Sequence, residues 1–198
     1  MRLSSEVAQI YATLTSVIIA GVLNMIFVKL PVLSELNKPI DRGRCLSDGM
    51  RLFGDNKTWK GFWGMVAFGG IAQVIWSAVC CSIPALAEKN QLIVAHGSSL
   101  AANLCAGLLF GLAYALFELP NSFIKRRLGI AAGKTDKGIK GALFYVIDQI
   151  DSLIGVVLCL SLLCTISFAQ YWLYILVGFF THSAVNLILY ALRIRRNI

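Results

Sequence analysis

The chain has 198 residues, of which 58% are hydrophobic and only 14% are charged, and its mean hydropathy is +0.74. This composition excludes an ordinary soluble domain and is typical of a protein that crosses a bilayer several times. A formal net charge of +8 would suggest nucleic acid as the partner of a soluble protein, but basic residues also collect in the cytosolic loops of membrane proteins.

Five apolar segments are each long enough to cross about 30 Å of hydrocarbon as a helix. They run over Val7–Leu30, Phe62–Leu86, Leu100–Phe117, Ala142–Leu163 and Tyr171–Leu192. We therefore expect an all-α integral membrane protein with five transmembrane helices, forming a single membrane domain over residues 1–198. Two long loops, 31–61 and 118–141, connect the first span to the second and the third to the fourth.

The basic residues alternate with the crossings of the chain. The two long loops are rich in lysine and arginine, whereas the connection between the second and third spans carries only Lys89 and the last connection carries none. The C-terminal tail adds Arg193, Arg195 and Arg196, and only Arg2 precedes the first span. The positive-inside rule then predicts that both long loops and the C-terminus are cytosolic and that the N-terminus lies outside.

Small and polar residues within the spans predict helix packing. Gly107 and Gly111 form a GxxxG pattern in the third span, which would let a neighbouring helix approach closely. His182 and Asn186 lie four residues apart in the fifth span. They could touch a substrate, but hydrogen bonding between helices is the favoured interpretation.

The first long loop carries more than the charge that topology requires. It combines glycines, turn-forming acids and amides, and cations: Gly43, Gly49, Gly54, Asp41, Asp48, Asp55, Asn56, Arg51, Lys57 and Lys60. Glycine permits positive φ, carboxylates can bind cations, and arginine and lysine can bind phosphate. The loop is therefore either a phosphate site or an ordered structural loop held by turns.

The second long loop begins with a segment that could bind an anion. We expect Asn121 or Ser122 to cap a short helix that contains Lys125 and Arg126. A helix N-terminus beside a hydroxyl group and cations suits an anion. The alternative is a polybasic segment that holds anionic lipid headgroups.

Two carboxylates, Asp148 and Asp151, stand at the cytosolic end of the fourth span. Their i, i+3 spacing places them on one helix face, where they would repel each other without a partner. Because Mg²⁺ accepts one or two carboxylates together with phosphate oxygens, the pair predicts a metal site, to which Glu118 could add a third ligand. The alternative is pairing with lysine or arginine from the loops.

Together, these features favour nucleotidyl or phosphoryl transfer onto a lipid embedded in the membrane. Metal-binding carboxylates, phosphate-binding cations and glycine-rich turns are all expected at one cytosolic interface. Two other functions stay open: an ion transporter that uses the carboxylates as a path, and a non-catalytic scaffold that binds anionic lipid. The carboxylates lie at a span end rather than at mid-membrane, which disfavours the transporter.

Five segments, in their order and spacing, resemble those of a known family. The segments are Pro39–Gly43, Asp48–Arg51, Gly54–Gly61, Leu119–Ile130 and Asp148–Asp151. They are similar to the CDP-archaeol synthases, the short five-span branch of the CDP-diglyceride synthetase superfamily. One position departs from this pattern, because related enzymes often have Gly-Asp before the Leu-Pro-x-Ser run and this chain has Phe117 and Glu118.

The resemblance implies a reaction in which a lipid phosphate attacks the α-phosphorus of CTP, with Mg²⁺, to give a CDP-lipid and pyrophosphate. It implies that Asp148 and Asp151 bind the metal, with Glu118 as a possible third ligand. The residues implied to bind CTP and phosphate are Asp41, Arg51, Asp55, Asn56, Lys57, Ser122, Lys125 and Arg126. Those implied to act in catalysis are Lys125, Arg126, Asp148 and Asp151. The lipid would be archaeol-like or diacylglycerol-like.

Overall fold

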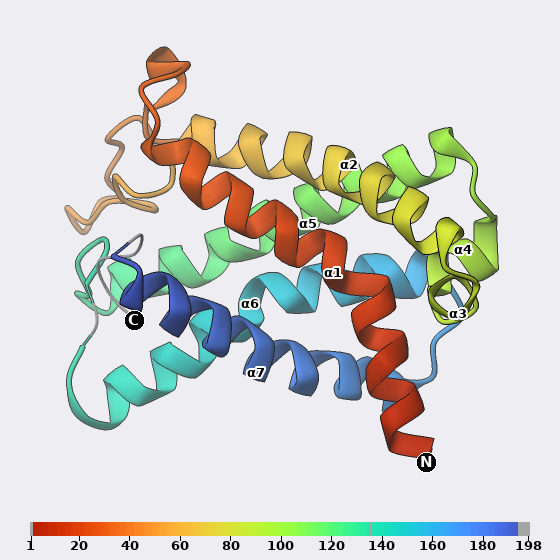
Figure 1. Ribbon diagram of the computed structural model, residues 1–198. Coiled ribbons are helices and arrows are strands. Elements are labelled where there is room, and N and C mark those ends of the chain that lie inside the picture. The colour runs from red at the N-terminus through yellow and green to blue at the C-terminus, as the bar shows by residue number, and fades with distance from the viewer. Residues whose placement is uncertain (1, 135, 194–198) are drawn as a thin grey trace.

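The computed structural model describes residues 2–134 and 136–193, and within these residues the chain is helical with five long helices (Figure 1). The long helices are α1 (Arg2–Lys29), α2 (Trp59–Ser82), α5 (Leu100–Arg127), α6 (Gly138–Leu163) and α7 (Phe168–Ala191). Each is long and apolar enough to cross a membrane, which confirms the predicted all-α class and the five long apolar helices. Arg195 and Arg196 of the predicted basic tail lie outside the described residues.

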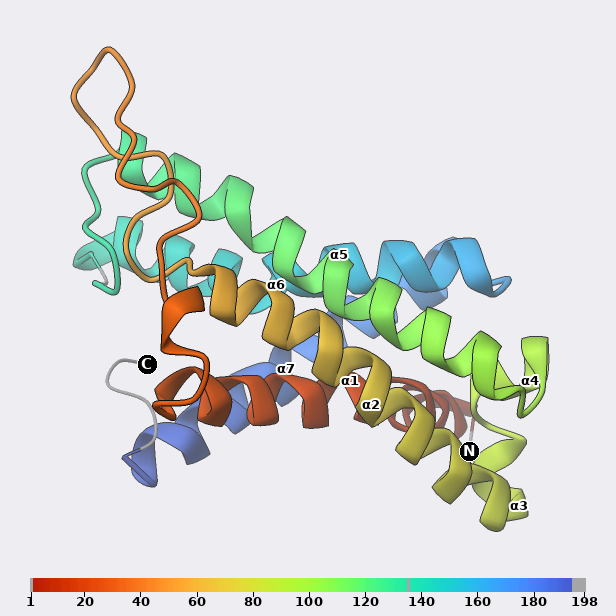
Figure 2. The same cartoon turned by 90° about the horizontal axis from the view of Figure 1, so that it is seen from above.

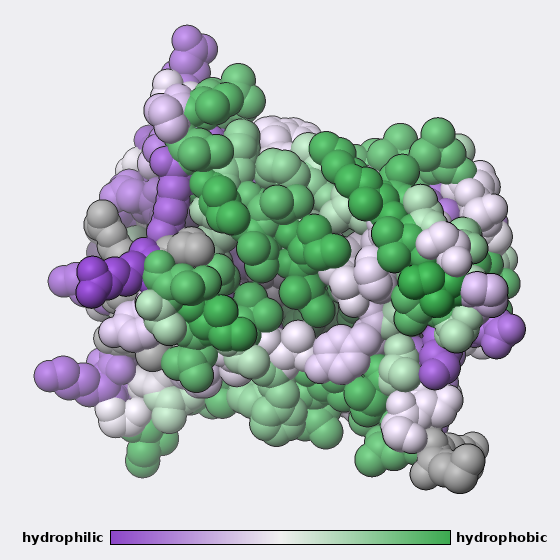
Figure 3. All heavy atoms as spheres, in the orientation of Figure 1, coloured by the Kyte–Doolittle hydropathy of each residue, from purple (hydrophilic) through white to green (hydrophobic). Residues whose placement is uncertain are grey.

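Three short helices lie in the connections. They are the 3₁₀ helix η1 (Ser34–Leu36), and α3 (Pro84–Ala87) and α4 (Gln91–His96), which join α2 to α5. The loop between α1 and α2 and the loop between α5 and α6 lie together at one end of the molecule, and α3 and α4 lie at the other (Figures 1 and 2). Hydrophilic residues gather at the loop end, and apolar residues cover the middle of the face shown in Figure 3. Which end faces the cytosol stays a prediction.

The third long helix is longer than its apolar segment indicates. The sequence places its end at Phe117, but α5 runs through Pro120 to Arg127. The expected helix cap at Asn121 or Ser122 is therefore wrong, and so is the short separate helix that it would begin. The physical reason is that the Asn121 side chain bonds to carboxylates of α6 instead of to its own backbone.

Glycines bring α2 and α5 into backbone contact. A Cβ atom on Gly107 would collide with the carbonyl oxygen of Gly69, and one on Gly111 would collide with the carbonyl oxygen of Met65. Only glycine fits at such a close approach, so the predicted packing role of the GxxxG pattern is confirmed. This contact fixes α5, and with it the charged segment at its C-terminal end.

A buried polar network ties α1 to its neighbours. Ser16 donates to Gln73 of α2 at 2.5 Å, and Gln73 donates to Asn103 of α5 at 3.0 Å. Figure 1 shows that α1 bends in its N-terminal half. In the same half of α1, the Ala12 carbonyl accepts hydrogen bonds from Trp76 at 2.7 Å and from Asn90 at 2.8 Å. Side chains from α2 and from the connection that follows it therefore hold this half of α1.

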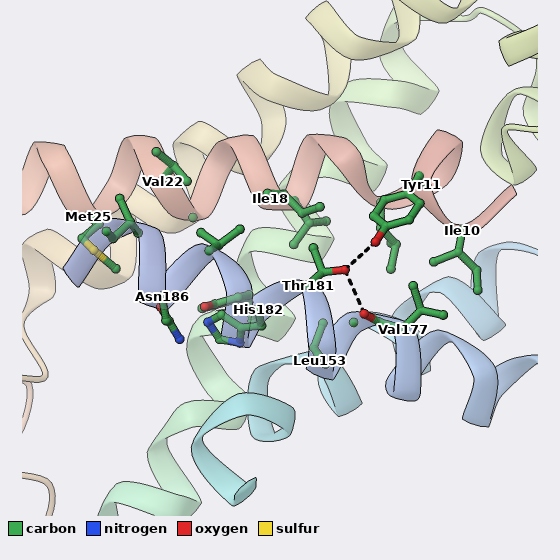
Figure 4. Close-up of a pocket in the computed structure, with 17 residues that line it drawn as sticks. Ile10, Tyr11, Ile18, Val22, Met25, Leu153, Val177, Thr181, His182 and Asn186 are labelled. Carbon is green, nitrogen blue, oxygen red and sulfur yellow. Dashed lines mark hydrogen bonds between the residues drawn. The ribbon is translucent and has the colours of Figure 1, made fainter. Parts of the chain in front are cut away.

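Helix α7 packs on α6 and touches α1 only lightly. His182 Nδ1 lies 3.1 Å from the Gln149 carbonyl oxygen, and Asn186 donates to the Gln149 side chain at 2.7 Å. The favoured interpretation of His182 and Asn186, hydrogen bonding between helices, is confirmed. Between α1 and α7, the hydroxyl groups of Tyr11 and Thr181 lie 2.9 Å apart (Figure 4).

Candidate functional site

Asp41 organises the first long loop from a buried position. Its carboxylate accepts backbone hydrogen bonds from Gly43 at 3.1 Å and from Phe53 and Gly54 at 3.0 Å each. Burial disfavours its charge, but the bond from Arg51 and these amide bonds outweigh burial and hold the pKa of Asp41 well below its usual value. The oxygens of Asp41 are thus engaged by the loop itself.

Arg51 is held by two carboxylates of the same loop. Its Nη2 donates to Asp41 at 2.6 Å, and its Nη1 donates to Asp55 at 2.9 Å. The bond to Asp41 is the main cause that raises the pKa of Arg51 above its usual value. The resemblance implies that Asp41, Arg51 and Asp55 bind CTP, which stays a prediction, and the structure brings the three side chains together in one hydrogen-bonded group of the loop.

The two long loops are joined by Arg127 and by a glycine. Arg127 donates to both carboxylate oxygens of Asp48, at 2.8 and 2.6 Å, and also to the Arg51 carbonyl. Gly54 has φ of +104°, and a Cβ atom there would lie 2.8 Å from the Ala132 side chain. Glycine is required at this position both by the positive φ and by the close approach of the second long loop.

The carboxylate pair of α6 faces the charged end of α5. Asn121 Nδ2 donates to Asp148 at 2.6 Å and to Asp151 at 2.7 Å, so a single amide group bridges the two acids. Lys125 Nζ lies 2.7 and 2.5 Å from the two oxygens of Asp148. The prediction that Asp148 and Asp151 share one helix face is confirmed. Asp148 also forms an ion pair with Lys125, as the alternative to a metal site predicted.

The same cluster has the chemistry of a magnesium site. One amide nitrogen lies within hydrogen-bond distance of both carboxylates, so a small cation placed between them would also reach both. The Oδ1 atom of Asn121 is buried there without a hydrogen-bond partner. These are hard oxygen atoms, the ligands that Mg²⁺ prefers, so the residues present fit the metal that the sequence suggested. Within the described part of the chain, no three His, Cys, Asp or Glu side chains form a metal-binding group.

Glu118 of α5 forms an ion pair with Lys57 of the first long loop, and its part in a metal site stays a prediction. Burial opposes the charge of Lys57, but the attraction of Glu118, with smaller contributions from Asp151 and Asp148, outweighs burial and raises the pKa of Lys57. Lys57 is therefore a firmly charged cation beside the carboxylate pair. Both residues line a cavity of about 270 Å³, where they and Asn56 stand among mainly apolar side chains.

Arg126 is the cation of the site that lacks a full set of partners. Only 8% of its surface is exposed, and its Nε and Nη1 atoms are buried without a hydrogen-bond partner among the described residues. It points toward Gly54, where an added Cβ would lie 3.4 Å from Nη1. Ser122 is buried one turn before it on α5. A buried guanidinium with unused N–H groups is a strong attractor for a phosphate anion.

Sequence reasoning missed Asn121 and Arg127 as parts of the site. The sequence predicts Asn121 as a helix cap, and no sequence pattern distinguishes a capping amide from one that bridges carboxylates on another helix. For Arg127 the sequence indicates only a positive charge of the loop. Its position next to Lys125 and Arg126 was visible, but its contact with Asp48 depends on how the two long loops meet.

Comparisons with known proteins agree on one family. A family model described as CarS-like, CDP-archaeol synthase, matches residues 22–197. A CDP-archaeol synthase of Methanoculleus marisnigri is 36% identical over 138 residues, which cover 69% of this chain and 68% of that protein. One of Methanococcoides burtonii is 28% identical over 169 residues, covering 80% of this chain and 89% of that protein.

A solved structure shares the fold. It is described as an intramembrane enzyme for archaeal membrane lipid biosynthesis, and it superposes with a TM-score of 0.60. The match is 24% identical in sequence and covers 89% of this chain and 92% of that chain.

Proposed function

The chain belongs to the CDP-archaeol synthase family of CTP-dependent cytidylyltransferases, and from this premise we propose that its reaction takes place where the two long loops meet α5 and α6. The product of the family is a CDP-activated lipid of archaeal membranes, CDP-archaeol. The observation that carries the proposal is the buried guanidinium of Arg126, which has nitrogen atoms without a hydrogen-bond partner among the described residues and interacts electrostatically with Asp148.

In the proposed mechanism the cations hold the nucleotide. Arg126 donates to phosphate oxygens of CTP, and Lys125 adds a second positive charge from the next position on α5. We assign polar contacts with the substrates to Asn56, which lines the same cavity as Lys57, and to Ser122, which lies one turn before Arg126 on α5. Mg²⁺, when bound, would be held by Asp148 and Asp151 beside Asn121 and would neutralise charge that develops on the phosphates.

The lipid phosphate is the nucleophile. One of its oxygens attacks the α-phosphorus of CTP, a new P–O bond forms, and the bond between the α-phosphorus and the bridging oxygen breaks to release pyrophosphate. A phosphate monoester is already largely ionised near neutral pH, so a strong general base is not needed. We assign to Lys57, which lines the cavity of about 270 Å³, the role of holding the lipid phosphate for this attack.

This mechanism needs the loop end of the molecule in the cytosol, which is the orientation that the sequence predicts. CTP is a cytosolic metabolite, so the loop end must face the cytosol, as the clustering of basic residues in both long loops supports. Neither rival function accounts for Arg126, because an ion path needs no phosphate-binding guanidinium and a scaffold needs no carboxylate pair beside it.

The test is turnover by the purified protein. Labelled CTP and a panel of isoprenoid ether and diacyl lipid phosphates should give CDP-lipid only with Mg²⁺ present. The Asp148→Asn, Asp151→Asn double variant should lose at least about a hundredfold in rate, the magnitude typical for losing charge stabilisation in a transition state. Asp136→Asn is the matched control, because Asp136 pairs with Lys140 away from the site.

Two results would contradict the proposal. Full activity of the double variant would remove the carboxylate pair from the mechanism. An absence of turnover with every lipid phosphate of the panel would remove the activity itself.

A further inference from the structure

The side-chain amide of Asn121 is bonded at one end and unbonded at the other. Its Nδ2 atom donates to Asp148 at 2.6 Å and to Asp151 at 2.7 Å. Its Oδ1 atom is buried without a hydrogen-bond partner among the described residues, and only 7% of the residue is exposed. Burying an amide oxygen without a partner costs free energy, so this oxygen calls for an explanation.

The bonded end of the amide answers a need of the two carboxylates. An ionised carboxylate accepts hydrogen bonds and donates none, and two of them on one helix face repel each other unless donors or cations lie between them. Asp148 also pairs with Lys125. Asp151 accepts hydrogen bonds from the Asn121 amide and from the Ser152 backbone N–H. The Nδ2 atom of Asn121 is therefore the donor that the two acids share.

A half-turn about the Cβ–Cγ bond of Asn121 would exchange the two ends of the amide without moving the backbone. This terminal torsion is broad in asparagine, so the turn needs no strained rotamer. Oδ1 would then lie where Nδ2 lies, 2.6 and 2.7 Å from one oxygen of each carboxylate. Neighbouring ligands of an octahedral Mg²⁺ ion lie about 2.9 Å apart, so the three oxygens would have nearly the spacing of one coordination shell.

We propose that Asn121 is a two-position ligand, which donates Nδ2 to the carboxylate pair when no cation is bound and turns its amide to offer Oδ1 to Mg²⁺ when one is. This inference rests on the proposed function, which assigns Mg²⁺ to Asp148 and Asp151. Glu118 would have to leave Lys57 to reach the same cation, whereas Oδ1 of Asn121 has no described partner to leave.

An amide suits both positions because it carries a donor and an acceptor on one carbon atom. A carboxylate at position 121 could bind the cation but could not donate to Asp148 and Asp151, and it would add a third negative charge. An aliphatic side chain could do neither. The amide therefore keeps the acids together without the metal and completes the metal site with it.

The test measures the binding of Mn²⁺ alone to the full chain in detergent. Mn²⁺ takes the same oxygen ligands as Mg²⁺, and electron paramagnetic resonance counts its free form. Asn121→Ala is compared with Asn103→Ala, since Asn103 is a second buried asparagine of α5 and donates to the Ser99 carbonyl at 3.0 Å. The Asp148→Asn, Asp151→Asn variant defines the Mn²⁺ that binds elsewhere.

We expect Asn121→Ala to bind Mn²⁺ at least about tenfold more weakly than the unmodified chain and Asn103→Ala, the size of loss typical for a group that supports a metal site. A residue that only donates to the acids would give the opposite sign, because its N–H competes with the cation for the same oxygens. A Kd for Asn121→Ala equal to or below that of the unmodified chain would overturn the proposal.

A second variant, Asn121→Cys, decides the question where Asn121→Ala does not fold, because it keeps a side chain of more similar size. A thiolate at a ligand position shifts a site toward soft metal ions. Cd²⁺ should therefore release half of the bound Mn²⁺ at a concentration at least about tenfold lower than in Asn103→Cys, the control with the same number of cysteines. Equal concentrations in the two variants would show that the side chain at position 121 does not reach the cation.

The outcomes separate the two proposals. If the unmodified chain binds no more Mn²⁺ than the Asp148→Asn, Asp151→Asn variant, with CTP or without it, the metal site of the proposed function fails. If the unmodified chain binds Mn²⁺ and the Asn121 variants bind it equally well, only the two-position ligand fails.

Discussion

Arg126 illustrates how a single residue can serve function at the expense of stability. Its guanidinium is buried at the loop end of α5, and two of its nitrogen atoms have no hydrogen-bond partner among the described residues. Its neighbour Arg127 has the opposite character, because it bonds to Asp48 and to the Arg51 carbonyl. Burying an unpartnered charge destabilises a fold, whereas a satisfied arginine that joins two loops stabilises it.

We predict that Arg126→Met raises the melting temperature in detergent while it abolishes most activity. Removing the buried charge should stabilise the protein by about 1 kcal/mol or more, which corresponds to about 2–4 °C for a chain of this size. The loss of phosphate binding should lower kcat/KM for CTP by at least about a hundredfold. Thermal unfolding monitored by intrinsic fluorescence and the labelled-CTP assay measure the two effects.

Arg127→Met is the matched control on the adjacent position. It should lower the melting temperature, because it removes the bonds that join the two long loops. A fall in melting temperature for Arg126→Met of the same size as for Arg127→Met would show that Arg126 is a structural residue after all.

The residues of the site were predictable to different degrees. The spacing of Asp148 and Asp151 was enough to place both on one helix face, because helix geometry is local. The burial of Asp41 was not predictable, since it depends on amides of Phe53 and Gly54 twelve and thirteen residues away. The Asn121 bridge depends on how two helices are placed relative to each other, which no local pattern encodes.

At the scale of the helices, the glycine contact between α2 and α5 sets the position of the site. Gly107 and Gly111 allow the two backbones to touch, and the charged segment from Asn121 to Arg127 continues from the same helix. A shift of α5 relative to α2 would therefore move Lys125 and Arg126 together.

We predict that Gly111→Val strongly destabilises the protein. Its Cβ would collide with the carbonyl oxygen of Met65, and a backbone atom cannot move aside as a side chain can. Forced overpacking of this kind costs about 1–3 kcal/mol, which should lower the melting temperature by several degrees. The control is Gly21→Ala in α1, where an added Cβ meets open space and should leave the melting temperature equal or slightly higher. Equal melting temperatures for the two variants would contradict the packing role.

The helices were largely predictable because about twenty consecutive apolar residues leave a chain few alternatives in a bilayer. The ends of the helices were less predictable. The segment after Phe117 is polar and contains Pro120, which read as a loop, yet the helix continues to Arg127 because bonds from Asn121 and Lys125 to α6 stabilise it. Apolar length measures the membrane-crossing part of a helix and misses a polar extension.

At the scale of the whole molecule, the two ends differ in chemistry. Both long loops lie at one end, and α3 and α4 lie at the other (Figure 1). The proposed reaction requires the loop end to face the cytosol, as the distribution of basic residues also predicts.

We predict that a membrane-impermeant thiol reagent reaches Cys45 only from the cytosolic side. Cys45 is exposed in the first long loop and would be kept as the single cysteine of an active variant. Ser99→Cys in an otherwise cysteine-free chain probes the exposed connection at the other end and should react only from the outside. Labelling of intact cells and of inverted vesicles measures both, and reversal of the two patterns would contradict the orientation.

The hydrogen bonds to the Ala12 carbonyl have a consequence for the order in which the helices assemble during synthesis. Its outside donors, Trp76 and Asn90, come from parts of the chain that leave the ribosome well after α1. In hydrocarbon a side-chain N–H without a partner is costly, so Trp76 and Asn90 should find the Ala12 carbonyl as soon as their segments enter the membrane. The first helix would then gain these contacts late in synthesis, from residues more than sixty positions downstream.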